Sequence, residues 1–319
     1  MLNILAIIAP IYILILIGFA TTRAGLFAKA DMRVFGKFVI NLALPALLLR
    51  ALSQRQVGEI LNVSYLLAYC IGSWAVIGLG YAWCRRVSRL NPATSAFYAM
   101  GMSCANSGFI GYPILLLTLA PVAGVSLALN MVVENLLVIP FLLFMAERKP
   151  GSAGRWQTLG KALARLICNP LILGLLAGLT VSVLGLTLPA PVTRTVDTLA
   201  TACSALSLFV IGGTLVGLPM GGLGSRIVPI VVGKLVLHPL CVLLAITLLP
   251  MLGLPEIDRS LSAAAVLMAA MPMMGIYATL GQAYGQEDFS AVTLLITTIA
   301  SFFTLSALLF LLGAFHALP

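Results

Sequence analysis

The sequence has few charged side chains. Asp, Glu, Lys and Arg make up 8% of its 319 residues, whereas a soluble domain carries roughly 25%. Hydrophobic residues make up 61%, and the mean hydropathy is +1.12. This composition excludes an ordinary soluble domain and is typical of an integral membrane protein.

The chain is also poor in the residues that several kinds of active site require. It has 2 histidines, and its 6 cysteines form no CxxC pair, so neither a zinc site nor a disulfide framework is expected. It has no HExxH or GxSxG motif and no nucleotide-binding loop. Basic runs with interleaved aromatic residues are absent, which argues against nucleic acid as a partner. We therefore expect no enzyme activity, no metal and no cofactor.

Long apolar segments take up most of the chain. A bilayer core of about 30 Å needs about 20 apolar residues to cross it. The segments predict an all-α polytopic membrane protein with ten transmembrane helices. They run over residues 3–22, 34–52, 64–84, 93–119, 122–146, 164–186, 195–218, 227–250, 260–284 and 288–314. The longest polar loop, 147–161, divides the chain into halves of five spans, 1–146 and 162–319.

Basic residues predict the orientation in the membrane. Thirteen of them fall in one alternating set of loops: Arg23, Lys29, Arg33, Lys37, Arg85, Arg86, Arg89, Arg148, Lys149, Arg155, Lys161, Arg165 and Arg226. The other set has four: Arg50, Arg55, Arg194 and Arg259. Cytoplasmic loops carry the excess of Lys and Arg. We therefore expect a multi-pass protein of the bacterial inner membrane, with both termini outside and the central loop inside.

Two of the expected spans are interrupted by glycine and proline. In the fourth span, Gly108 is placed as the residue just past a helix end and Pro113 as the first residue of a second half-helix. The ninth span has Pro272 and Gly275. Five spans per half put the halves in opposite orientations, so these two interruptions correspond. Broken helices at matching positions of inverted repeats indicate a carrier site, whereas a plain kink would need no counterpart.

Motifs in these spans resemble those of a known family. They are Asn106-Ser-Gly-Phe-Ile-Gly-Tyr-Pro113 in the fourth span, Asn41-Leu-Ala-Leu-Pro45 in the second, Pro239 in the eighth, and Pro272 followed by Tyr284-Gly285 in the ninth. The sequence resembles the auxin efflux carrier family, whose bacterial members include malonate permeases. The resemblance implies two inverted five-helix repeats whose broken helices, the fourth and ninth, cross. It also implies a scaffold domain of spans 1, 2, 6 and 7 and a transport domain of spans 3–5 and 8–10.

The expected substrate site lies at the two breaks. Free N–H groups at half-helix N-termini bind anions. The candidate residues are Asn106, Ser107, Gly108, Gly111, Tyr112, Pro113, Met271, Pro272 and Met273, together with Asn41 and Pro45 of the resembling motif in span two. Asn106 either donates to a carboxylate or caps the broken helix. The methionines either line a crossing that shifts between states or pack the core.

Two charged residues lie within predicted spans, where charge is expensive and usually functional. Glu134, in span five, is a candidate proton or cation site, or else forms a structural hydrogen bond or ion pair. Lys234, in span eight, either attracts the anion or snorkels to the surface. His238, one turn further along, is expected to be a packed core residue.

The sequence therefore predicts a secondary transporter that moves a small carboxylate, malonate-like, by alternating access. Other substrates stay open: malate, an auxin-like acid, or a bile-acid-type anion with sodium coupling. A channel is the second alternative. The expected partners are a small organic anion, a coupling proton or sodium ion, the lipid bilayer and a second copy of the chain in a homodimer. A larger aromatic substrate would need an aromatic box that the sequence does not show.

Overall fold

A computed structural model describes residues 2–54, 62–146, 169–217, 226–275, 277, 281 and 285–314. The first half contains α1 (Leu2–Arg23), α2 (Lys29–Phe38), η1 (Val39–Ala43), α3 (Leu44–Ser53), α5 (Val63–Arg86), α6 (Pro92–Ser103), η2 (Ser107–Gly111), α7 (Tyr112–Thr118), α8 (Ala120–Val132), η3 (Val133–Val138) and α9 (Ile139–Ala146). The second half contains α11 (Pro170–Val183), α12 (Ala190–Thr214), α13 (Ile227–Val232), η4 (Gly233–Leu237), α14 (His238–Leu248), η5 (Leu249–Leu252), α15 (Arg259–Ala270) and α17 (Glu287–Ala314). The predicted loop 147–161, Arg55 and Tyr284 lie outside the described residues.

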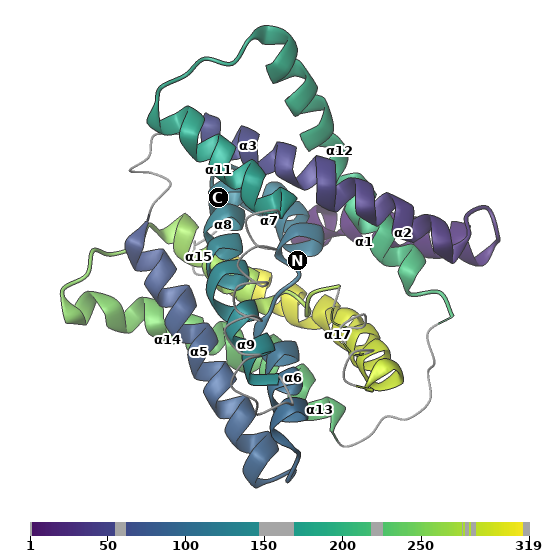
Figure 1. The fold of residues 1–319 in the computed structure, drawn as a ribbon, viewed down its shortest axis with the longest axis vertical. Helices are drawn as coiled ribbons and strands as arrows, with labels where there is room; N and C mark the ends of the chain where they lie inside the picture. Colours follow the sequence, from purple (N-terminus) through teal and green to yellow (C-terminus); the bar gives the residue numbers. More distant parts are fainter. Residues whose placement is uncertain are drawn as a thin grey trace, which may run out of the picture.

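The expected all-α membrane class is confirmed over the described part of the chain (Figure 1). Six helices are long and apolar enough to cross a membrane: Lys29–Ser53, Val63–Arg86, Ala120–Leu142, Ala190–Thr214, Ile227–Leu252 and Phe289–Gly313. Shorter apolar helices fall in the remaining expected segments: Ala9–Arg23, Ser107–Thr118, Pro170–Val183 and Arg259–Ala270. The arrangement as ten spans in two inverted repeats stays a prediction.

Several helices begin at a polar cap. The side chains of Asn62, Asn91, Asn169 and Asp258 accept hydrogen bonds from backbone N–H groups in the first turns of α5, α6, α11 and α15. An Asn or Asp cap satisfies one of the N–H groups that a helix start leaves free. These caps fix where each apolar helix begins, close to the loops that the sequence predicts.

Four of the apolar helices contain a π-helical turn, and each turn ends two residues before a proline. η1, η2, η3 and η4 end at Ala43, Gly111, Val138 and Leu237, and the prolines are Pro45, Pro113, Pro140 and Pro239. Proline has no N–H and its ring clashes with the carbonyl four residues back. The wider π turn supplies the extra residue that lets the helix continue past this clash. Proline therefore changes the pitch locally, and both buried charges lie in such turns, Glu134 in η3 and Lys234 in η4.

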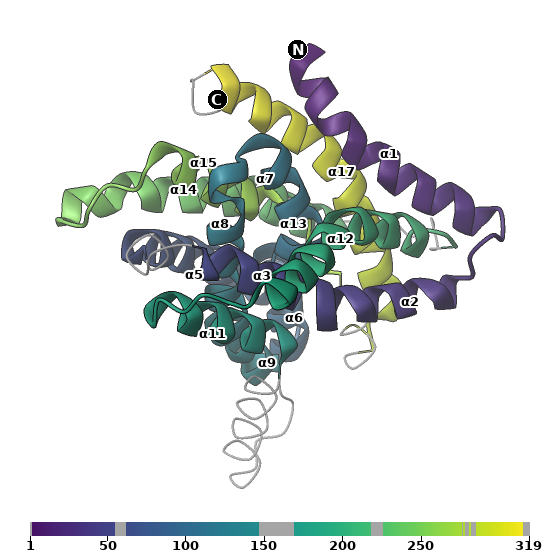
Figure 2. The same ribbon diagram turned by 90° about the horizontal axis from the view of Figure 1, so that it is seen from above.

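The helices pack in two groups. In the first, α1, α2 and α3 pack on α12, and α11 packs on α3 (Figure 1). In the second, α5 packs on α6 and α14, while α15 packs on α8, α14 and α17. In the view from above, α14 and α15 lie on one side of α8, and α3 and α11 lie on the other (Figure 2). α7, α8 and η2 lie where the groups meet, because they also contact α1, α3 or α12.

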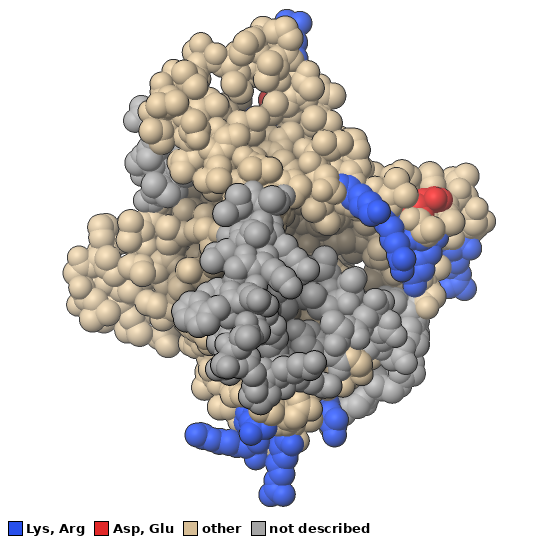
Figure 3. Space-filling view, viewed as in Figure 1, with Lys and Arg blue, Asp and Glu red and all other residues tan. Residues whose placement is uncertain are grey.

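Exposed charged side chains gather at helix ends. In this view Lys and Arg lie over the connection between α1 and α2 and over the connection between α5 and α6, while most of the described surface is uncharged (Figure 3). Leu16, Leu244 and Phe303 are among many large apolar side chains on the outside. An exterior of this kind suits contact with lipid. Which end faces the cytoplasm stays a prediction.

Candidate functional site

The break in the fourth span lies nearer its start than the sequence predicts. α6 ends at Ser103, Cys104 is extended, and the second half begins with η2. Gly108 was expected just past a helix end and Pro113 at the start of the new half. Both expectations are wrong, because Gly108 is inside η2 and Pro113 is the second residue of α7. The chain leaves the helix at 104–106 because polar partners for its backbone are found there.

The broken helices of spans four and nine meet at their breaks. Ala105 and Met273 form an isolated antiparallel bridge. The backbone N–H of Asn106 donates to the carbonyl of Pro272 over 2.8 Å, and that of Met274 donates to the carbonyl of Cys104 over 3.2 Å. Non-helical backbone at membrane depth must find partners within the protein. The two breaks therefore satisfy part of each other's hydrogen bonding.

Glu134, which lies in η3, supplies hydrogen-bond acceptors to the break in the fourth span. Its Oε1 accepts from the backbone N–H of Ala105 and the hydroxyl of Tyr69, both over 3.0 Å, and its Oε2 accepts from the hydroxyl of Ser107 over 3.1 Å. Glu134 is 4% exposed. A carboxylate at the start of a half-helix is also favoured by the helix dipole. The structural hydrogen bonds weighed for Glu134 are therefore present.

Lys234, which lies in η4, supplies a hydrogen-bond donor to the break in the ninth span. Its Nζ donates to the carbonyl of Ala269 over 2.6 Å, in the last turn of α15, and lies 2.9 Å from Nδ1 of His238. Lys234 is 0% exposed, so the expectation that it snorkels to the surface is wrong. A cation at a helix C-terminus is favoured by the dipole. Each break thus holds the charge that suits its half-helix end, negative at the N–H end and positive at the carbonyl end.

Polar side chains of α5 connect the two charges. The ring of Tyr69, which donates to Glu134, packs edge-on against His238 with centroids 5.6 Å apart. Nε2 of His238 lies 3.0 Å from the hydroxyl of Ser73. His238 is fully buried, as expected of a core residue, and is also hydrogen-bonded. Over the described part of the chain, no group of three or more His, Cys, Asp or Glu side chains could hold a metal ion.

A crossing of two broken helices with buried residues of opposite charge is typical of a carrier site. A family model for membrane transport proteins, the auxin efflux carrier family, matches residues 3–309. The chain belongs to this family. It is therefore a membrane transporter and not an enzyme.

Similar transporters include bacterial proteins of comparable length. A Rhizobium meliloti protein named "Putative malonate transporter" is 32% identical over 322 residues, covering 100% of this chain and 98% of that protein. The "Uncharacterized transporter YfdV" of Escherichia coli K12 is 25% identical over 216 residues, covering 65% of this chain and 67% of that protein.

Within this transporter, most of the expected site residues lie near the crossing. Asn106 is 6% exposed, and its Oδ1 accepts from the N–H of Phe109 over 3.3 Å, so it caps η2. Its Nδ2 lies toward Gly275 and has no hydrogen-bond acceptor among the described residues. Met271, Pro272 and Met273 form the ninth-span side of the crossing and are almost fully buried.

Gly111 is needed for close packing. A Cβ on Gly111 would lie 2.6 Å from Sδ of Met268 and 3.3 Å from Cγ of Met271. η2 therefore approaches the end of α15 more closely than a larger residue allows. This contact supports the core-packing interpretation of the methionines.

The two expected site residues of span two lie away from the crossing. Asn41 is exposed on η1, and its Nδ2 donates to the carbonyl of Lys37 over 2.7 Å in its own helix. Pro45 packs against α11, where a Cβ on Gly174 would lie 2.6 Å from the Pro45 backbone. The structure does not bring either one together with Asn106.

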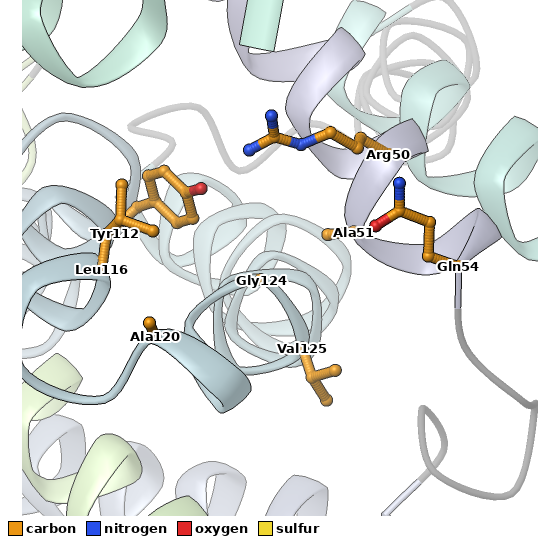
Figure 4. Close-up of a pocket in the computed structure, with 8 residues that line it drawn as sticks. All are labelled: Arg50, Ala51, Gln54, Tyr112, Leu116, Ala120, Gly124 and Val125. Carbon is orange, nitrogen blue, oxygen red and sulfur yellow. The ribbon is translucent and has the colours of Figure 1, made fainter. Parts of the chain in front are cut away.

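Tyr112 lines a separate cavity between α3, α7 and α8, with Arg50 and Gln54 (Figure 4). The sequence analysis did not identify Arg50 as a site residue, because it used Arg50 only as one of the loop cations that predict the orientation. Its place one helical turn before the end of an apolar span was the available signal. Tyr69 and Ser73 were also missed, because their spacing in α5 resembles that of ordinary helix-packing residues.

Proposed function

We propose that this transporter is a secondary carrier that moves a small organic anion by alternating access. The observation that carries the proposal is the crossing of the fourth and ninth spans. There, unwound backbone from both halves meets at buried residues of opposite charge. Unwound helices at the middle of a membrane bind solutes in carriers of this architecture. We infer ten spans in two inverted repeats, because the breaks fall in the fourth helix of each half.

The two packing groups support a division into a scaffold and a transport domain. α1, α2, α3, α11 and α12 correspond to spans 1, 2, 6 and 7, and the helices around the crossing correspond to spans 3–5 and 8–10. Movement of the second group against the first would carry the crossing between the two faces of the membrane. α7 and α8 would then slide along α1, α3 and α12.

A small carboxylate fits the donors at the crossing. Glu134 already accepts from Ala105 and Ser107 at the start of η2, so a substrate anion must use other donors. Nδ2 of Asn106, which lies toward Gly275, can serve as such a donor. Malonate is the leading candidate, because the full-length relative is named for it. Malate, an auxin-like acid and a bile-acid-type anion with sodium coupling are the competing substrates.

Transport of labelled malonate into liposomes that contain the purified protein tests the function. We expect saturable uptake, acceleration by malonate inside the liposomes, and competition by other small carboxylates. Counterflow of this kind separates a carrier from a channel. Competition by indole acetate without competition by malonate would overturn the substrate assignment. Uptake that does not saturate would favour the channel.

We also propose that both termini face outward in the bacterial inner membrane. Reporter fusions after Arg155 and after Pro319 test this orientation. A cytoplasmic signal is expected from the first and a periplasmic signal from the second. The reverse pattern at either position would contradict the ten-span topology.

A further inference from the structure

The cavity between α3, α7 and α8 has the size and the chemistry of a small-anion site. Its volume is about 360 Å³, within the range of ligand pockets. Arg50 and Gln54 line it from α3, and Tyr112 lines it from α7 (Figure 4). No acidic side chain is among its lining residues. The cavity therefore presents one guanidinium, one amide and one phenol.

The guanidinium of Arg50 has N–H donors that its contact with Asp197 does not use. Its Nη1 lies 3.9 Å from Oδ1 of Asp197, and these side chains are 27% and 44% exposed. An exposed pair at this distance contributes little. The guanidinium extends toward the hydroxyl of Tyr112 (Figure 4). A guanidinium has five N–H donors in a planar fork that matches a carboxylate, so an incoming carboxylate can replace Asp197.

The backbone adds positive potential at the same place. The N-terminal part of α8 lines the cavity through Ala120 and Gly124, and its N-cap residue, Leu119, supplies no side-chain acceptor. The N-terminus of a helix carries a partial positive charge. A Cβ on Gly124 would lie 2.4 Å from Cβ of Ala51, so glycine lets α8 lie directly against α3. The cavity is thus built where the two groups of helices touch.

The cavity is close to the crossing but separate from it. Tyr112 follows Asn106 by six residues along the second half of span four, a rise of roughly 9 Å at 1.5 Å per residue. Arg50 lies at the end of α3 that meets the loop expected outside. The cavity therefore lies to one side of the crossing, toward one face of the membrane.

The geometry points to a second anion site, in which Arg50, Gln54 and Tyr112 bind the substrate carboxylate before it reaches the crossing. This inference rests on the proposed function, since it assigns an entry step to the same carboxylate. The site serves one face only. Because it lies between the moving groups, it is complete only while α7 and α8 hold their present position against α3.

Transport assays that measure uptake separately from each face of the membrane test this site. Labelled malonate uptake is measured in right-side-out and in inside-out membrane vesicles with the wild type, Arg50→Gln and Arg194→Gln. Arg194 is a matched control, because it is exposed at the same end of the molecule and does not line the cavity. From the face that carries Arg50, Arg50→Gln should raise the half-saturating malonate concentration by about ten-fold, as for the loss of a bond to a charged group. From the opposite face it should leave that concentration unchanged, and Arg194→Gln should change neither.

Two more conservative variants distinguish a loss of binding from a loss of folding. Arg50→Lys keeps the charge without the fork, and Tyr112→Phe keeps the ring without the hydroxyl, so both should give smaller one-sided increases. An equal increase from both faces, or none in Arg50→Gln, would overturn the entry site and leave the carrier function standing. A wild type that takes up no carboxylate from either face would instead overturn the proposed function, and the entry site with it.

Discussion

The contacts between helices within the first group differ in kind from those within the second group. Where α1 meets α12, the contact is a close approach of backbone: a Cβ on Gly212 would lie 1.8 Å from the carbonyl oxygen of Ile15. Around the crossing, glycines also let helices approach, but polar side chains add to them. Of the described residues, the buried charged ones, Glu134 and Lys234, both belong to this second group.

The difference follows from the state of the backbone. Unbroken helices satisfy their own hydrogen bonds, so their contacts in a membrane depend on close packing of small residues. Broken helices leave N–H and carbonyl groups that cost free energy unless they are paired. Glu134 and Lys234 supply those partners, and they make the crossing both stable and polar. The region that looks weakest in the sequence is therefore one where side chains of other helices bond to the broken backbone.

The largest effect is expected from Glu134→Ala. This change leaves the N–H of Ala105 and the hydroxyls of Tyr69 and Ser107 without their acceptor. Each buried donor left unsatisfied costs about 1–3 kcal/mol, and three of them are affected at once. Unfolding of the purified protein in detergent measures this cost. A free energy of unfolding equal to that of the wild type would show that the crossing does not need the carboxylate.

Asn106→Ala should weaken substrate binding. If Nδ2 donates to the carboxylate, its loss costs about 1.5–3 kcal/mol of binding free energy, the range for hydrogen bonds to charged groups. Malonate-dependent protection against heat measures the affinity.

Asn106→Ser is the matched control for the cap. Serine caps a helix about as well as asparagine, so this variant keeps the bond to Phe109 but lacks the amide donor. If Asn106→Ser binds malonate as the wild type does, Asn106 only caps the break.

Gly212→Ala should perturb the first group of helices without touching the site. The added methyl group meets the backbone of Ile15, which cannot rotate away, so α1 and α12 must separate. Overpacking of this kind costs about 1–3 kcal/mol of stability. Malonate affinity of the folded fraction should stay as in the wild type. Gly78→Ala is the control, because a Cβ there meets nothing within 4 Å; equal losses in both variants would refute the packing argument.

The smallest structural effect and the sharpest functional one are expected from Glu134→Gln. A glutamine Oε1 keeps the bonds to Ala105 and Tyr69, and its amide can donate to Ser107, so the fold should survive. If Glu134 carries the coupled proton, malonate accumulation should no longer respond to a pH gradient, while exchange across the membrane continues. Accumulation in liposomes with an imposed gradient measures both. If malonate accumulation in this variant depends on the pH gradient as it does in the wild type, Glu134 has a structural role alone.

The sequence determined that this protein lies in a membrane as a bundle of helices, because so few of its residues can face water. It also indicated which helices are broken, since glycine and proline act through local backbone chemistry. The residues Asn106, Ser107, Pro272 and Met273 were found in this way, and the structure places them together. Their family is confirmed by the match over residues 3–309.

Only the tertiary structure decided where the fourth span breaks and what completes the break. The end of α6 at Ser103 depends on acceptors from Glu134 and Pro272, which lie far along the chain. Lys234 looked able to reach the surface, and packing instead buried it against Ala269. Arg50 faces Tyr112 across the cavity because α8 packs against both α3 and α7. Pairings between distant segments depend on how helices pack, and neither composition nor local spacing records that packing.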